Sequence, residues 1–130
     1  MKRQDLARLR AVAETLYEAE LAKLRGNAAA ATAVQQQVDR LRGERVMRAD
    51  EMRGLTAPDP AQLGSADLHW DRWTGEHLRR LQAERARLEA EAEALRDGAR
   101  LAFGRGQALD AVAEKLKAEA LKRARRRAET

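Results

Sequence analysis

The sequence predicts an all-α protein in which two long helices form an antiparallel coiled-coil hairpin. The composition favours helix, because alanine, leucine, glutamate and arginine dominate while aromatic residues make up only 3% of the chain. A seven-residue repeat of apolar positions runs through the second half. Glycine and proline interrupt the helical pattern at one place only, near the middle of the 130 residues. We therefore expect residues 1–130 to be a single helical hairpin.

The first arm, about residues 3–53, carries apolar residues at steps of mostly three and four. A four-four step at Ala13-Tyr17-Leu21 and a three-three step at Ala28-Ala31-Val34 depart from the heptad. Such steps predict a stutter and a stammer, which change supercoiling locally without ending the helix.

The hinge, about residues 54–65, contains both prolines of the chain. Gly54 suits the left-handed residue that ends a helix. Asp59-Pro60 is typical of the first residues of a short helical turn. Ser65 can cap the following helix, and Asp67 is favourable in its first turn.

The second arm, about residues 66–128, has a heptad seam, a stripe that keeps facing one partner helix. Its first row is Leu81, Leu88, Leu95, Ala102, Leu109 and Leu116, and the residues four positions later are Arg85, Ala92, Ala99, Gly106, Ala113 and Ala120. The small residues of the second row predict a close approach of the two backbones at Gly106, and a flexible point there is the alternative.

A fold point near residue 60 places Leu24 opposite Leu95 and Ala99, and Leu6 opposite Ala113 and Leu116. The end of the second arm then extends beyond the hairpin as a basic tail, residues 120–130. This tail holds most of the net charge of +5. It can be a solvated helix end, a segment that binds an acidic protein pocket, or a segment that binds nucleic acid or a membrane surface.

The residue types exclude several classes of site. There is no cysteine, and the two histidines, His69 and His77, are eight residues apart, so we expect no metal site. No nucleophile with a nearby base and no phosphate-binding loop is present, so we expect no cofactor, no small-molecule substrate and no enzymatic activity. The chain has no apolar run that could cross a membrane, and its first ten residues lack a secretory signal, which favours a cytoplasmic location.

Both tryptophans, Trp70 and Trp73, lie just after the hinge. One interpretation is that they cap the end of the hairpin against Met52, Leu55 and Leu63. The other is that they are exposed aromatic anchors for a partner protein.

Four parts of the sequence resemble the FliJ family. They are the segment Arg100-Leu-Ala-Phe-Gly-Arg-Gly-Gln-Ala-Leu-Asp110, the heptads that follow it to Lys117, the Leu6-x-x-Leu9 register through Leu24, and the Trp70-x-x-Trp73 segment. These are coiled-coil stalk proteins of flagellar and other type III export machines, similar to the gamma subunit stalk of rotary ATPases. The resemblance implies a cytoplasmic stalk, working at the inner face of the membrane in a secretion complex. It assigns Arg123, Arg125, Arg126 and Arg127 to contact with a hexameric export ATPase, and Trp70 and Trp73 to the export gate protein.

An alternative function is a generic coiled-coil scaffold or adaptor that dimerises through its exposed apolar faces. A two-helix hairpin shields only one stripe of each helix, and several seam positions are alanine or glycine. Their burial contributes little against the entropy that each ordered residue loses. We therefore expect this protein to work inside a complex or as a homodimer, with nucleic acid the least favoured partner.

Overall fold

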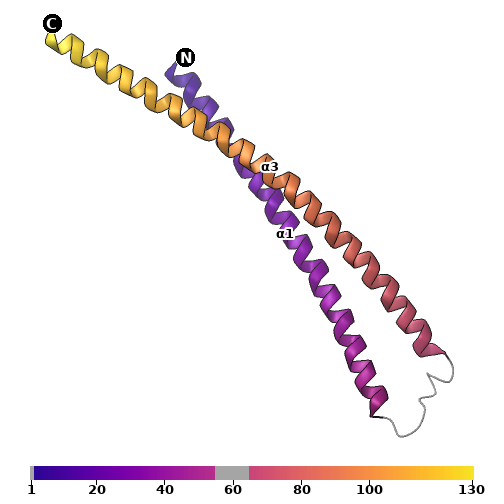
Figure 1. The fold of residues 1–130 in the computed structure, drawn as a ribbon. Helices are drawn as coiled ribbons and strands as arrows, with labels where there is room; N and C mark the ends of the chain where they lie inside the picture. The colour runs from indigo at the N-terminus through magenta and orange to yellow at the C-terminus, as the bar shows by residue number, and fades with distance from the viewer. Residues whose placement is uncertain (1, 55–64) are drawn as a thin grey trace. The chain divides into compact units, whose positions relative to one another are not determined.

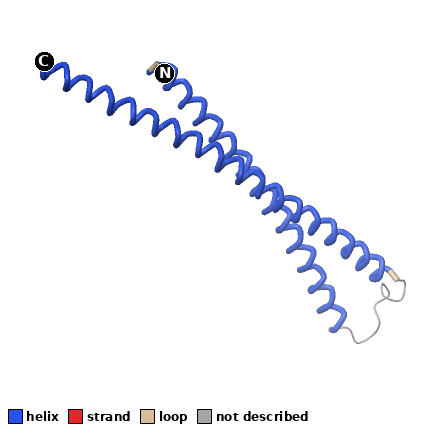
Figure 2. The backbone as a smooth tube through the Cα atoms, turned by 45° about the horizontal axis from the view of Figure 1, so that its top comes forward, coloured by secondary structure: helices blue, strands red, loops and turns tan. Residues whose placement is uncertain are grey.

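The computed structural model describes residues 2–54 and 65–130 and contains two long helices in this part of the chain. Helix α1 spans Arg3–Arg53 and helix α3 spans Ala66–Glu129. The two run antiparallel and pack against each other (Figure 1), and Figure 2 shows helix along almost the whole described chain. The predicted all-α hairpin is confirmed. The short turn predicted at Asp59-Pro60 lies outside the described residues.

The chain divides into two compact units, which are described separately below. The central unit is Gly26–Ala92, and the terminal unit combines Met1–Arg25 with Glu93–Thr130. In both units an α1 segment lies against an α3 segment. In the terminal unit Arg10 pairs with Asp110, and the rings of Tyr17 and Phe103 lie 5.6 Å apart. These pairings follow the register predicted from a fold point near residue 60.

The central unit has a core of large aliphatic side chains. These are Val34, Val38 and Leu41 of α1 and Leu78, Leu81 and Leu88 of α3, with Ala31 packed against them. Each fully buried side chain of this kind contributes about 1.5–3 kcal/mol to folding. The central unit therefore contains most of the hydrophobic stabilisation that the described residues show.

The terminal unit has a core of mostly small side chains. Its buried apolar residues are Leu6, Ala13, Ala99 and Ala102. Larger apolar side chains nearby stay exposed, among them Leu9, Val12, Leu16, Leu101 and Phe103. Alanine in the seam thus leaves this unit with apolar surface that neither helix covers.

The predicted seam of α3 is buried or half-buried at all but two of its positions. Arg85 and Ala120 are exposed; Arg85 instead forms an exposed ion pair with Glu89. The seam also begins one heptad earlier than predicted, because Thr74 and Leu78 are buried. Thr74 was not predicted, since a hydroxyl side chain gives no apolar signal.

The seam of α1 keeps the heptad without interruption, so the predicted stutter and stammer are wrong. Its two rows are Leu6, Ala13, Glu20, Asn27, Val34, Leu41 and Arg48, and Tyr17, Leu24, Ala31, Val38, Arg45 and Met52. Ala28, expected in the seam, is exposed, and Asn27 is half-buried in its place. Polar residues occupy seam positions here, and a pattern built on apolar residues alone shifts to their neighbours.

At the end of α1 and the start of α3, the structure differs from the prediction at Gly54 and agrees with it at Ser65. Gly54 does not adopt a left-handed conformation; its amide still donates a helical hydrogen bond to the Asp50 carbonyl at 3.1 Å. Ser65 is the residue with positive φ, at 65°. Its carbonyl accepts from the His69 amide at 3.1 Å, so it occupies the predicted N-cap position of α3.

The close backbone approach predicted at Gly106 is also wrong, because a Cβ atom there would meet nothing within 4 Å. Two other glycines of α3 face long polar side chains instead. A Cβ atom at Gly98 would lie 2.8 Å from Glu20 Oε2, and one at Gly75 would lie 3.1 Å from Arg45 Nη2.

We predict that Thr74→Val raises the free energy of unfolding by about 1 kcal/mol. Thr74 is 0% exposed and its hydroxyl has no hydrogen-bond partner. Valine keeps the shape and removes the unsatisfied polar group. Thermal or urea unfolding followed by circular dichroism measures the change. Thr74→Ser keeps the hydroxyl and loses a methyl group, so it should destabilise; stabilisation by serine and not by valine would contradict the prediction.

We predict that Gly54→Ala stabilises the protein by about 0.5–1 kcal/mol, because alanine suits helical backbone and restricts the unfolded chain. The added Cβ would meet only the carbonyl oxygens of Glu51 and Asp50, at 3.6 and 3.7 Å. Gly43→Ala, within α1, is the matched control and should give a similar gain in the same unfolding experiment. A loss of stability in Gly54→Ala but not in Gly43→Ala would contradict the prediction and indicate a left-handed conformation at residue 54.

Candidate partner-binding surfaces

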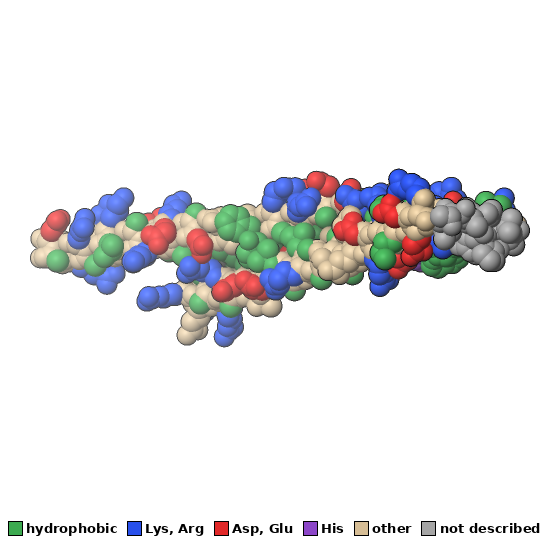
Figure 3. Space-filling view, turned by 90° about the horizontal axis from the view of Figure 1, so that it is seen from below, with side chains coloured by type: hydrophobic (Ala, Val, Ile, Leu, Met, Phe, Trp, Pro, Cys, Tyr) green, Lys and Arg blue, Asp and Glu red, His purple; other side chains and the backbone are tan. Residues whose placement is uncertain are grey.

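The basic tail is helical and fully exposed. Helix α3 continues to Glu129, and every residue from 117 to 130 is exposed. Within the terminal unit, α3 extends past the start of α1, and Figure 3 shows Lys and Arg side chains along this free end. The predicted site residues Arg123, Arg125, Arg126 and Arg127 therefore project from a helix that has no partner helix beside its last turns.

The basic surface continues from the tail to the start of α1. A cavity of about 640 Å³ lies between the two segments and has Arg3, Arg10, Lys117 and Arg123 in its lining, against the single carboxylate of Glu114. Arg10 is neutralised by Asp110, with 2.9 Å between Nη2 and Oδ1. The remaining cations Arg3, Lys117 and Arg123 give the start of α1 and the end of α3 one positive surface, whereas the sequence pattern placed the positive charge on the tail alone.

The two tryptophans have different environments. Trp70 is half-buried and lines a cavity of about 460 Å³ together with Met52, one of the residues that the capping interpretation names. Leu55 and Leu63, the other predicted contacts, lie outside the described residues. Trp73 is 54% exposed, and its ring stacks on His77 at 5.2 Å with 8° between the planes. Of the two tryptophans, Trp73 therefore presents the more exposed ring.

Polar side chains in the α1 seam make specific contacts with α3, and none of them was predicted. Asn27 Nδ2 donates to the Leu88 carbonyl at 3.0 Å. Arg48 donates from Nη2 to Asp67 Oδ1 at 2.7 Å, between two partly buried side chains. A strict seven-residue count along α1, without regard to polarity, would have placed both side chains in the seam.

Arg45 also belongs to this polar seam. Its Nη2 donates to the Asp71 carbonyl at 3.1 Å and lies 3.3 Å from Asp71 Oδ1, while its buried Nε has no partner. These contacts join the two helices of the central unit at a second level, beside the Arg48–Asp67 pair.

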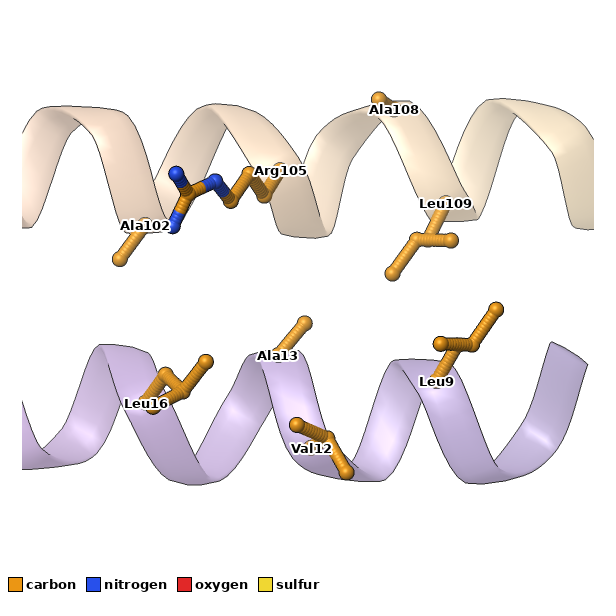
Figure 4. Close-up of a pocket in the computed structure, with 8 residues that line it drawn as sticks. All are labelled: Leu9, Val12, Ala13, Leu16, Ala102, Arg105, Ala108 and Leu109. Atoms are coloured by element: carbon orange, nitrogen blue, oxygen red, sulfur yellow. The ribbon is translucent and has the colours of Figure 1, made fainter.

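An apolar groove runs between the helices of the terminal unit. Figure 4 shows Leu9, Ala13 and Leu16 of α1 pointing toward Ala102 and Leu109 of α3. The groove has a volume of about 340 Å³, and Val12, Ala108 and Arg105 complete its lining. In the face shown in Figure 3, hydrophobic side chains gather along the line where the helices meet.

Residues 2–54 and 65–130 contain no cluster of three His, Asp or Glu side chains that could hold a metal ion. A hydrogen bond from Arg87 holds the pKa of the Glu84 carboxyl below its ordinary value, but both side chains are on the helix surface. Neither described helix contains a stretch long and apolar enough to span a membrane.

Comparison with known proteins adds no identification. No protein-family model, no curated protein and no solved structure matches this chain.

Proposed function

We propose that this protein is the non-enzymatic, cytoplasmic coiled-coil stalk of a flagellar or type III protein export apparatus. In this proposal the joined ends of α1 and α3 dock on the hexameric export ATPase, and the end of the hairpin near Trp73 contacts the export gate protein. The stalk then couples the two partners mechanically, and it needs no cofactor.

The exposed, helical arginine tail is the observation that carries the proposal. Arginines that protrude on a helix can each form charge-assisted, bidentate hydrogen bonds with carboxylates of a partner protein. The adjacent cations Arg3 and Lys117 widen the positive surface across both helices. Such a surface favours fast association with an acidic protein site.

Support for a second contact comes from Trp73. An exposed tryptophan already stacked on a neighbouring ring loses little conformational freedom when it binds. Trp70 offers a partner less surface, because it is half-buried and lines a cavity with Arg45, Met52 and Asp67. We therefore assign gate contact to Trp73.

The alternative function is a coiled-coil scaffold or adaptor that dimerises through exposed apolar faces. The exposed Leu9, Val12 and Leu16 of the terminal unit favour it, since apolar patches of this kind mark interaction sites. Sedimentation equilibrium separates the two candidates. A concentration-independent dimer without affinity for the ATPase supports the scaffold.

We predict that replacing Arg123, Arg125, Arg126 and Arg127 by alanine abolishes stimulation of the cognate export ATPase, because the cations that meet its acidic residues are lost. ATP hydrolysis by the purified ATPase, titrated with this protein, measures the effect. Arg125→Ala/Arg126→Ala alone should raise the concentration of this protein that gives half-maximal stimulation. Raising the salt concentration should have the same effect on the unaltered protein.

Arg79→Ala/Arg80→Ala is the matched control for the Arg125→Ala/Arg126→Ala variant, because it removes the same two charges from exposed positions of the central unit. It should stimulate the ATPase like the unaltered protein. Equal stimulation by the tail variant and this control would reject docking through the tail.

We predict that Trp73→Ala weakens binding to the export gate protein by about tenfold or more, because a buried tryptophan anchor is lost from the interface. Isothermal titration calorimetry with the purified gate domain measures the affinity. Leu68→Ala, another exposed apolar residue near the start of α3, is the control and should bind normally. Normal binding by a folded Trp73→Ala protein would remove this residue from the gate contact.

A further inference from the structure

The apolar groove of the terminal unit contains one charged residue, Arg105. The other seven lining residues are Leu9, Val12, Ala13, Leu16, Ala102, Ala108 and Leu109. Figure 4 shows the Arg105 side chain lying along α3, with its guanidinium reaching toward Ala102. Arg105 makes no hydrogen bond or ion pair with any described residue, whereas Arg87, Arg96 and Arg100 on the same helix each pair with a carboxylate.

Any molecule that covers this groove buries its three leucine side chains and the Arg105 guanidinium. Burial of the leucines is favourable, but a guanidinium removed from water costs free energy unless a carboxylate pairs with it. The groove therefore requires an occupant with an apolar stripe and an acidic group at the level of Arg105.

We propose that the groove binds one amphipathic α-helix of another protein, whose apolar residues fill the space between Leu9 and Leu16 and whose carboxylate pairs with Arg105. An antiparallel helix pair offers a third helix a groove of this kind, into which residues at i, i+3 or i+4, and i+7 insert. From Leu9 to Leu16 the groove spans about two helical turns. Leu101 and Val112, both partly exposed on α3, extend the apolar surface to about three turns.

A second copy of this chain fits the groove less well. Two-fold dimers place the same surface of each copy in the interface. Arg105 lines the groove between Leu9 and Leu16, so a two-fold pairing through this groove would bury two guanidinium groups together. None of the lining residues is acidic, so neither cation would be neutralised within the groove. Charge complementarity thus selects a partner with a different sequence.

This proposal rests on the groove alone and does not depend on the export apparatus. To test it, the full-length chain is panned against a displayed library of single helices of about 20 residues, long enough to fold in isolation, with one randomised face. The enriched sequences should carry apolar residues at helical spacing and an acidic residue among them. A synthetic peptide of the leading sequence should lose about tenfold in affinity with Arg105→Ala, measured by fluorescence anisotropy. With Arg105→Glu as the target, the library should yield lysine or arginine at the acidic position.

Leu16→Glu places a charge on the wall of the groove at a position that is 50% exposed, and it should abolish peptide binding. Val46→Glu is the matched control, since Val46 is 59% exposed on α1 in the central unit, and it should leave binding unchanged. Circular dichroism verifies that both variants are folded.

Three results would overturn the proposal. These are a library without enriched helices, enriched helices that bind the Leu16→Glu protein equally well, and enriched helices that lack an acidic residue or ignore Arg105→Ala. Sedimentation equilibrium provides a fourth. If the unaltered protein is a dimer that Leu16→Glu alone converts to a monomer, a second copy occupies the groove.

Discussion

The pairing of Arg48 with the Asp67 carboxylate sets the register on which the helix pairing of the central unit depends. Leucine and valine contacts alone allow two helices to slide by a heptad at little cost, because each apolar residue then meets another. A partly buried guanidinium that loses its carboxylate costs a desolvation penalty, and Thr74, one heptad after Asp67, has no carboxylate to offer. Arg45 adds the same constraint through Asp71, and in the terminal unit Glu20 adds it through Gly98. The bond from Asn27 to the Leu88 carbonyl adds little, because every residue of α3 has a backbone carbonyl.

The fold could be predicted from the sequence because one helix shows its heptads in apolar residues. From Leu81 to Leu116 periodicity and hydrophobicity coincide. In α1 the seven-residue period and the hydrophobic residues do not coincide. Glu20 and Asn27 occupy seam positions, and the apolar residues Leu21 and Ala28 are their neighbours. The apolar pattern therefore predicted a stutter and a stammer that the helix does not have. Gly54 and Gly106 were misread for a related reason. A glycine permits a left-handed residue or a close approach, but only the surrounding helix shows whether either is needed.

The candidate site was partly predictable. The charge density of the tail is visible in the sequence, and in the described part of the chain residues 117–130 are all exposed. The different exposure of Trp70 and Trp73 could not be predicted, because the two residues lie close together on the helical wheel. The positions of Met52 and Asp67 decide which ring is less exposed. The Arg105 groove is lined by Ala13, Ala102 and Ala108, whose small side chains leave Leu9 and Leu16 uncovered, so it depends on both helices at once.

The contrast between the large-residue core of the central unit and the alanine core of the terminal unit has a consequence for folding order. In the central unit Arg48 and Asp67 pair across only 19 positions of the sequence. In the terminal unit Arg10 and Asp110 pair across 100 positions. Loop-closure entropy favours the nearer pair by about 1.5 kcal/mol. The nearer pairs also bury the larger side chains. We therefore expect the helices to zip from the loop outward, with the chain ends joining last and separating first.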